Sequence, residues 1–126
     1  MLADSKAFSG FAVDDLEKAR AFYTDVLGLS ASIDDEQMGL MTLHLAGGRN
    51  TLVYARPNHE PAAYTILNFP VADIDSAVAD LAARGVKFEQ YDGMEQTESG
   101  VFTEGGPKIA WFKDPAGNVM AVLQDS

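Results

Sequence analysis

The chain has 126 residues, no cysteine and a formal net charge of −10, from 19 acidic and 9 basic residues. This composition excludes disulfides, thiolate metal sites and cysteine nucleophiles, and the negative charge argues against a nucleic-acid partner, which would need clustered Lys and Arg. The length suits one compact domain. No apolar run is long enough to span a membrane, and the opening MLADSKAF resembles neither a signal nor a transit peptide. We therefore expect a cytoplasmic protein.

The first half of the chain reads as a strand, a helix and three further strands. Asp15 is a natural N-cap, because its carboxylate can accept hydrogen bonds from the free amides of a first helical turn. Apolar residues then recur at helical spacing as far as Gly28, which supplies the left-handed residue wanted after a helix. Strands are expected at 30–34, 38–45 and 51–56, with a glycine turn at 46–50 joining the last two.

The second half repeats this order. The repeat is visible in matched residues: Phe11 with Phe69, Val13 with Val71, Asp15 with Asp73, and Gly28 with Gly85. Strands are expected at 86–91, 108–113 and 118–124, with a turn at 114–118. Residues 92–107 are expected to form a long loop or a short ragged strand, and loops of this length are more often binding elements than inert.

An internal repeat of this kind predicts a fold made of two similar units. We expect one α+β domain, residues 1–126, built from two tandem βαβββ modules at about 6–56 and 64–124, with a linker at 57–63. The modules should form a concave mixed sheet with the helices on its outer face. The alternative is a ferredoxin-like α+β domain in which the repeat is accidental.

Two segments of the sequence resemble known motifs. The segment VDDLEKARAFYTDVLGL at 13–29 resembles the opening of the vicinal oxygen chelate superfamily, which includes glyoxalases, bleomycin-resistance proteins and extradiol dioxygenases. FKDPAGN at 112–118 is similar to that family's closing hairpin. The resemblance spans nearly the whole chain and implies a paired βαβββ fold. It does not select an activity, because this fold hosts lyases, epimerases, dioxygenases, thiol transferases and metal-free drug-binding proteins.

The resemblance also implies where a metal would be held. Metal-using members place a His early in the first strand of each half and a Glu in the last strand. These positions fall on Phe8, Ile66 and Ala121, with a further position, used by glyoxalase-like members, at about Val53. None of these side chains can donate a lone pair, whereas iron, manganese or nickel needs imidazole and carboxylate donors. We therefore expect no metal, no other cofactor and no catalytic residue at these positions.

The two histidines are the remaining candidate donors. Superposing the turn at 46–50 on that at 114–118 places Leu43 over Trp111 and His44 over Phe112. The resemblance implies that Trp111 faces the cavity, so His44 is expected to face away from it. His59 lies in the predicted linker. Both are interpreted as solvated or edge histidines.

Strand alternation predicts which side chains line the cavity. Asn68 is the one clear hydrogen-bonding side chain among them, and Trp111 offers a large stacking face with one N–H donor. The predicted ligand-binding residues are Phe8, Met41, Leu43, Val53, Ile66, Asn68, Ile109, Trp111 and Ala121. Such a lining is typical of a pocket for a flat or hydrophobic small molecule. The alternative is a groove filled by its own side chains.

The sequence thus favours a metal-free protein that sequesters a hydrophobic or aromatic small molecule, such as a natural-product antibiotic, as in the bleomycin-resistance branch. The alternative is a lyase, isomerase or dioxygenase-type enzyme that works without a metal or with one at unorthodox positions, and chemistry by Asn68, Tyr54 or a loop carboxylate stays open. The resemblance also implies a homodimer, and a closed two-fold arrangement is common among small soluble proteins.

Overall fold

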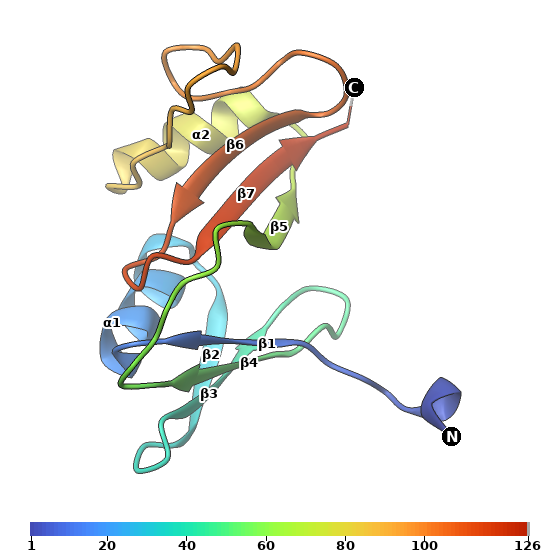
Figure 1. Ribbon diagram of the computed structural model, residues 1–126, viewed down its shortest axis with the longest axis vertical. Coiled ribbons are helices and arrows are strands. Elements are labelled where there is room, and N and C mark those ends of the chain that lie inside the picture. Colours follow the sequence, from blue (N-terminus) through green and yellow to red (C-terminus); the bar gives the residue numbers. More distant parts are fainter. Residues whose placement is uncertain (126) are drawn as a thin grey trace. The chain divides into compact units, whose positions relative to one another are not determined.

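Each copy of the repeat folds as a compact unit (Figure 1). The computed structural model describes residues 1–125, and the chain divides at His59 and Glu60, inside the expected linker. Ser126, the last residue of the expected domain, lies outside the described residues. Within residues 1–125, no helix is both long and apolar enough to cross a membrane.

The first unit contains a four-stranded sheet in the order β1-β4-β3-β2, in which only β1 and β4 run parallel. α1 (Leu16–Ala21) begins where the Asp15 carboxylate accepts a hydrogen bond from the backbone N–H of Lys18 at 3.1 Å. It continues as a π-helical segment, Phe22–Val26, and the chain leaves it at Gly28 with φ of 74°. The strands are β1 (Gly10–Val13), β2 (Ser30–Asp35), β3 (Leu40–His44) and β4 (Thr51–Ala55).

The second unit repeats this topology with three regular strands, in the order β5-β7-β6. β5 (Thr65–Pro70) and β7 (Val119–Gln124) are parallel, and β6 (Lys108–Lys113) is antiparallel to β7. α2 (Ile74–Ala83) is capped by Asp73, whose carboxylate accepts from the backbone N–H and the hydroxyl of Ser76. These two hydrogen bonds lower the pKa of Asp73. The α+β fold and the two modules expected from the sequence are confirmed.

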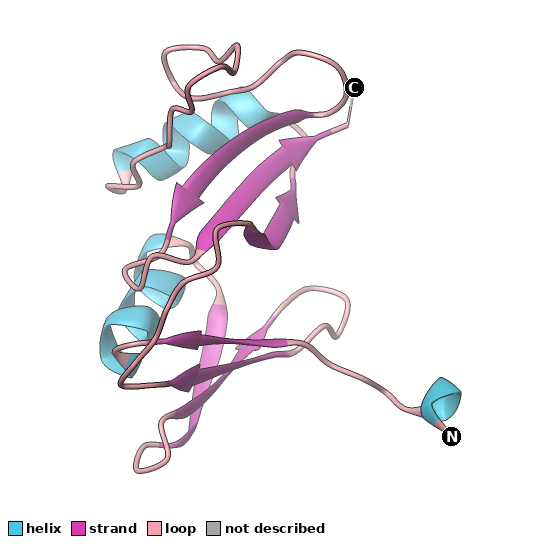
Figure 2. Cartoon of the chain, viewed as in Figure 1, coloured by secondary structure: helices cyan, strands magenta, loops and turns pink. Residues whose placement is uncertain are grey.

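The strand expected at 86–91 is the main difference from the sequence analysis. Only an isolated bridge between Phe88 and Phe112 forms there, and most of the segment between α2 and β6 is loop (Figure 2). The side chain of Gln96 explains this, because it accepts from the backbone N–H of Tyr91 at 2.8 Å and donates to the carbonyl of Glu89 at 3.0 Å. These backbone groups are therefore satisfied by a side chain rather than by a neighbouring strand.

The face of the first sheet that α1 covers is identified by an aromatic contact. The Phe11 ring lies 5.8 Å from the ring of Tyr23, which follows α1 and is fully buried. Phe11 is paired with Val53 across β1 and β4, and Val53 is paired with Met41 across β4 and β3. Paired residues share a face of a sheet, so these side chains form the core between this sheet and α1.

The corresponding face of the second sheet is identified by a hydrogen bond. The Gln124 side chain accepts from the backbone N–H of Ile74, the first residue of α2, at 2.8 Å. Because side chains alternate along a strand, Met120 and Val122 point to the same side as Gln124, and Phe112 pairs with Met120. These residues are buried and form the core beneath α2. The opposite face carries the odd-numbered residues of β6 and β7.

The hairpin between β6 and β7 is held by Asp114, which is only 5% exposed. Its carboxylate accepts from the backbone N–H groups of Ala116 (3.0 Å) and Asn118 (2.8 Å) and from the Asn118 side-chain amide (3.0 Å). Gly117 has φ of 88°, and a Cβ there would lie 3.0 Å from Pro61. The DPAGN motif therefore builds a tight turn and packs it against the start of the second unit.

Candidate functional site

Four of the predicted ligand-binding residues lie together on the face of the second sheet opposite α2. Trp111 and Asn68 are each paired with Ala121, on either side of β7. Ile109, two residues before Trp111 in β6, points to the same side. Ile66 lies at an irregularity of the β5–β7 pairing, between Thr65 and Leu67, so the register assigns it to neither face.

Trp111 lies in a pocket of about 240 Å³ on this face. The Tyr91 ring lies 5.5 Å from the Trp111 ring, with their planes at 74°, and Met94 comes from the loop that follows Tyr91. We call this site the aromatic pocket; its lining residues are Ala63, Tyr64, Thr65, Tyr91, Met94, Trp111 and Val119. Its side chains are mostly aromatic or apolar and none is charged, as is typical of small-molecule sites.

The loop at 92–107, which brings Met94 to the pocket, is stabilised by hydrogen bonds of its own side chains. Gln96 donates to the carbonyl of Gly100 at 2.8 Å in addition to that of Glu89, and Val101 donates from its backbone N–H to the hydroxyl of Thr97 at 3.0 Å. The Phe102 ring lies 6.2 Å from the ring of Trp111. The loop that supplies Met94 is therefore held by its own hydrogen bonds and contacts Trp111 through Phe102.

Tyr91 remains a neutral hydrogen-bond donor at physiological pH. Burial of the phenol raises its pKa, and the negative charge of Glu89 raises it further. Glu89 also forms an ion pair with Lys113, with 3.6 Å between carboxylate oxygen and ammonium nitrogen. The pocket can thus offer aromatic surface, the Trp111 N–H and the Tyr91 O–H to a ligand.

The predicted residues of the first unit are placed differently. Met41, Leu43 and Val53 are fully buried on the face that α1 covers. They therefore do not lie on the opposite face, where they were expected from the sequence, and none of them lines the aromatic pocket.

The cause is a one-residue difference between the two hairpins. Met41 pairs with Val53 as Ala110 pairs with Val122, so Thr42, rather than Leu43, takes the place of Trp111. A shift of one residue turns every side chain of a strand to the other face. By the same register, the first-half counterpart of Ala121 is Leu52, rather than Val53.

His44 therefore lies on the face opposite α1, contrary to the orientation expected from the sequence. Its Nε2 is 2.8 Å from the hydroxyl of Ser32, and Thr42 donates to the carboxylate of Asp34 at 2.6 Å. These four side chains form a polar row along β2 and β3. His59, expected to be solvated or at an edge, has a buried Nε2 that has no hydrogen-bond partner in the described part of the chain.

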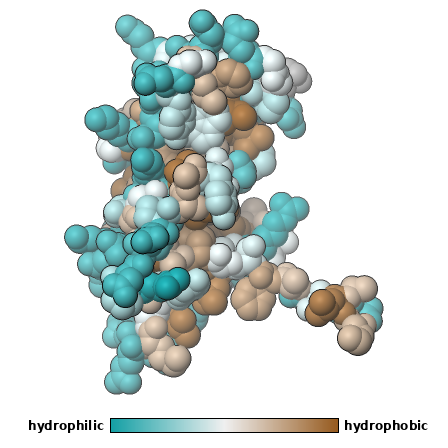
Figure 3. Space-filling view, viewed as in Figure 1, coloured by the Kyte–Doolittle hydropathy of each residue, from teal (hydrophilic) through white to brown (hydrophobic). Residues whose placement is uncertain are grey.

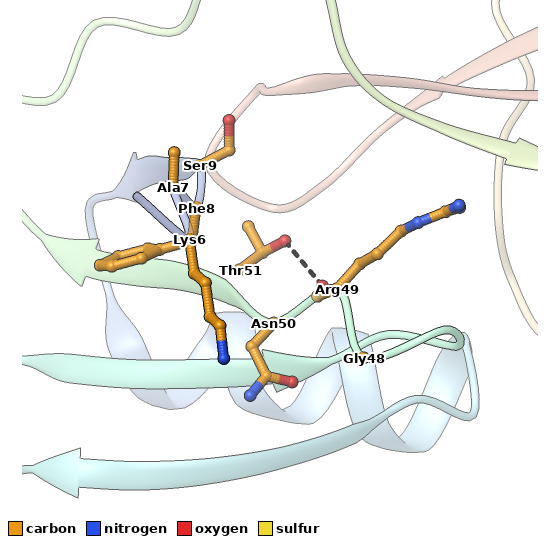
Figure 4. A pocket seen from close by; sticks show the side chains of 8 residues that line it. All are labelled: Lys6, Ala7, Phe8, Ser9, Gly48, Arg49, Asn50 and Thr51. Atoms are coloured by element: carbon orange, nitrogen blue, oxygen red, sulfur yellow. Dashed lines mark hydrogen bonds between the residues drawn. The ribbon is translucent and has the colours of Figure 1, made fainter. Parts of the chain in front are cut away.

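Phe8, the remaining predicted residue, precedes β1 and is 72% exposed. It lines a pocket of about 460 Å³ formed by residues 6–9 and 48–51, and a second pocket of about 290 Å³ that also includes Thr42 and Leu52. The side chains of Lys6 and Arg49 extend in different directions from the larger pocket (Figure 4). Residues 6–9 and 48–50 are all exposed. Tyr64, Tyr91 and Met94 of the aromatic pocket are exposed as well, so exposure does not distinguish the two sites.

The family of the chain follows from a match over most of its length. Residues 7–122 match the model of the Glyoxalase/Bleomycin resistance protein/Dioxygenase superfamily. The chain belongs to this superfamily. No curated protein matches it in sequence.

Solved structures extend the comparison to individual proteins. TnmS3, an antibiotic binding protein from Streptomyces sp. CB03234, is 26% identical over 98% of both chains, with a TM-score of 0.69. A superfamily member from Sphaerobacter thermophilus DSM 20745 is also 26% identical, over 96% of this chain and 98% of that chain, with a TM-score of 0.67. The fosfomycin resistance protein FosX from Listeria monocytogenes shares only the fold, with 13% identity over 98% of this chain and 92% of that chain and a TM-score of 0.73.

The superfamily includes metal-dependent members, and the donor set of this chain does not fit a metal. The positions expected to hold it carry Phe8, Ile66 and Ala121, and the first-half position is apolar whether Leu52 or Val53 occupies it. Among residues 1–125, no group of three or more His, Asp or Glu side chains is arranged to hold an ion. We therefore assign no reaction step to a metal at this site.

Proposed function

We propose that this superfamily member binds and sequesters a flat, mostly apolar small molecule, such as an aromatic natural-product antibiotic, in the aromatic pocket. The observation that carries the proposal is the position of Trp111, half-buried on the face opposite α2 with the Tyr91 ring 5.5 Å away. Offset and edge-to-face contacts between aromatic rings contribute about 0.5–1.5 kcal/mol beyond the burial of area. An aromatic ring of a ligand bound in this pocket would gain such contacts from both Trp111 and Tyr91.

The size of the pocket limits what it can hold. Its volume of about 240 Å³ lies below the range of roughly 300–1,000 Å³ usual for drug-sized ligands. The aromatic pocket therefore suits one ring system of a larger ligand. The likeness to TnmS3, an antibiotic binding protein, supports a natural product as the ligand class.

Fluorescence of Trp111 tests the proposal, because it is the only tryptophan of the chain. Titration with a panel of polycyclic aromatic antibiotics should give a saturable change in emission for at least one of them, as the ligand stacks on the indole. N-acetyltryptophanamide at equal absorbance controls for inner-filter effects. Emission that responds no differently from this control across the whole panel would contradict the proposal.

We also propose that the protein is a homodimer. β1 and β5 are terminal strands of their sheets, and exposed strand edges are usually paired or covered. The N-terminal segment carries apolar surface (Figure 3), and Met1, Leu2 and Phe8 are each more than two-thirds exposed. Light scattering should return a mass near twice the 13.5 kDa of one chain. A mass near 13.5 kDa throughout the micromolar range would show a monomer instead.

A further inference from the structure

We propose that the aromatic pocket selects a ligand with a cationic ammonium group, which the rings of Trp111, Tyr91 and Tyr64 hold. This inference rests on the proposed function and adds the charge of the ligand to it. A cation within about 6 Å of an aromatic ring centroid is attracted by the ring quadrupole, and sites with several rings recognise alkylated ammonium groups in this way.

The arrangement of the rings supports this class of ligand. The planes of Tyr91 and Trp111 meet at 74°, so the two rings form a corner, and Tyr64 supplies a third aromatic side chain to the same pocket. Tyr64 is 72% exposed and Tyr91 36% exposed. Much of this aromatic surface is thus accessible to a ligand instead of being packed in the core.

The charges around the pocket favour a cation. None of the side chains that line the pocket is a carboxylate, Lys or Arg. Glu89 is close enough to Tyr91 to raise the pKa of its phenol, and Asp92 and Glu95 flank Met94 in the sequence. The chain as a whole carries a net charge of −10, which raises the local concentration of cations.

Lys113 opposes this effect. Its ammonium lies 3.6 Å from the carboxylate of Glu89, and Lys113 and Trp111 are two residues apart in β6, so their side chains leave the same face. Neither Glu89 nor Lys113 lines the pocket. The two partners of this ion pair should therefore change the affinity for a cation in opposite directions when each is neutralised.

The test compares phenyltrimethylammonium with tert-butylbenzene, which has the same shape but no charge, in titrations followed by Trp111 fluorescence. The ammonium probe should bind about 2- to 30-fold more tightly, the factor that corresponds to a cation–π gain of about 0.5–2 kcal/mol. Lys113→Gln should tighten its binding and Glu89→Gln should weaken it, each by about 1.5- to 5-fold, with little change for tert-butylbenzene.

The opposite signs separate a charge effect from a structural one, because loss of the ion pair is common to both variants. Thermal melts of the two variants show whether both remain folded. Equal or tighter binding of tert-butylbenzene, or changes of the same sign in Lys113→Gln and Glu89→Gln, would overturn the inference and leave the proposed function intact. If neither probe changes the fluorescence up to millimolar concentration while polycyclic antibiotics do, the inference fails alone; if nothing does, both fail.

Discussion

Replacing Trp111 with Ala is expected to weaken ligand binding by about 1–3 kcal/mol, the range found when a large aromatic contact is truncated in a desolvated pocket. The indole lies beside Tyr91 and Phe102, and both ring contacts would be lost with it. Because the variant has no tryptophan, binding must be measured by calorimetry, with the ligand identified in the fluorescence titration.

Phe8→Ala and His44→Gln are the matched controls, since both residues belong to the first unit and neither lines the aromatic pocket. Each should leave the affinity within about 0.5 kcal/mol of the unmodified protein, because neither side chain belongs to the lining of the pocket. If Trp111→Ala lowers stability but leaves the affinity per folded molecule unchanged, Trp111 is a core residue. A large loss of affinity in Phe8→Ala would instead place the ligand in the first unit.

Replacing Asp114 with Ala is expected to lower the free energy of unfolding by about 3 kcal/mol. The buried carboxylate accepts from the backbone N–H groups of Ala116 and Asn118 and from the Asn118 side-chain amide. Its loss leaves the amide groups of Asn118, itself only 2% exposed, without these acceptors. An unsatisfied buried donor costs about 1–3 kcal/mol. Urea unfolding followed by circular dichroism measures the change.

Asp80→Ala is the control for this substitution. The Asp80 carboxylate forms an ion pair with the Arg84 guanidinium, with 3.5 Å between oxygen and nitrogen, but the Asp80 side chain is 64% exposed. An exposed pair of this kind contributes about 0–1 kcal/mol. Equal losses of stability in Asp114→Ala and Asp80→Ala would show that the hairpin network contributes no more than a surface contact.

The parts of the fold that follow local rules could be predicted from the sequence. Asp15 and Asp73 cap their helices, and Gly28 and Gly85 follow the helices with positive φ, because each of these roles depends on a few neighbouring residues. The turn of DPAGN is local in the same sense. The matched order of strands in the two sheets then follows from the repeat itself.

The orientation of β3 could not be predicted in this way. Superposing the two glycine turns on their sequence places Leu43 on Trp111, whereas the pairing of Met41 with Val53 shows that the correct superposition differs by one residue. That difference places Leu43 on the face that α1 covers and His44 on the opposite face, the reverse of what was expected. Period-two alternation gives the side chains that share a face, but it does not say which face the helix covers.

Most of the residues that line the aromatic pocket could not be predicted from the sequence either. The inward direction of Trp111 follows from the family resemblance, and Met94 lies in the loop at 92–107, whose length indicates a binding element. Tyr64 and Tyr91 lie outside regular strands, and the position of Tyr91 depends on how residues 89–107 fold. That loop is ordered by side-chain hydrogen bonds of Gln96 and Thr97, which leave no periodic pattern in the sequence.

The most direct test of the central claim is a ligand titration followed by 1H–15N NMR, in which Trp111 gives the single indole N–H resonance. The proposed site predicts a saturable shift of that resonance, together with the amides of Tyr91, Met94 and Val119, while the amides of residues 6–9 and 49–51 stay unchanged. Saturable shifts confined to residues 6–9 and 49–51, with an unmoved indole, would contradict it.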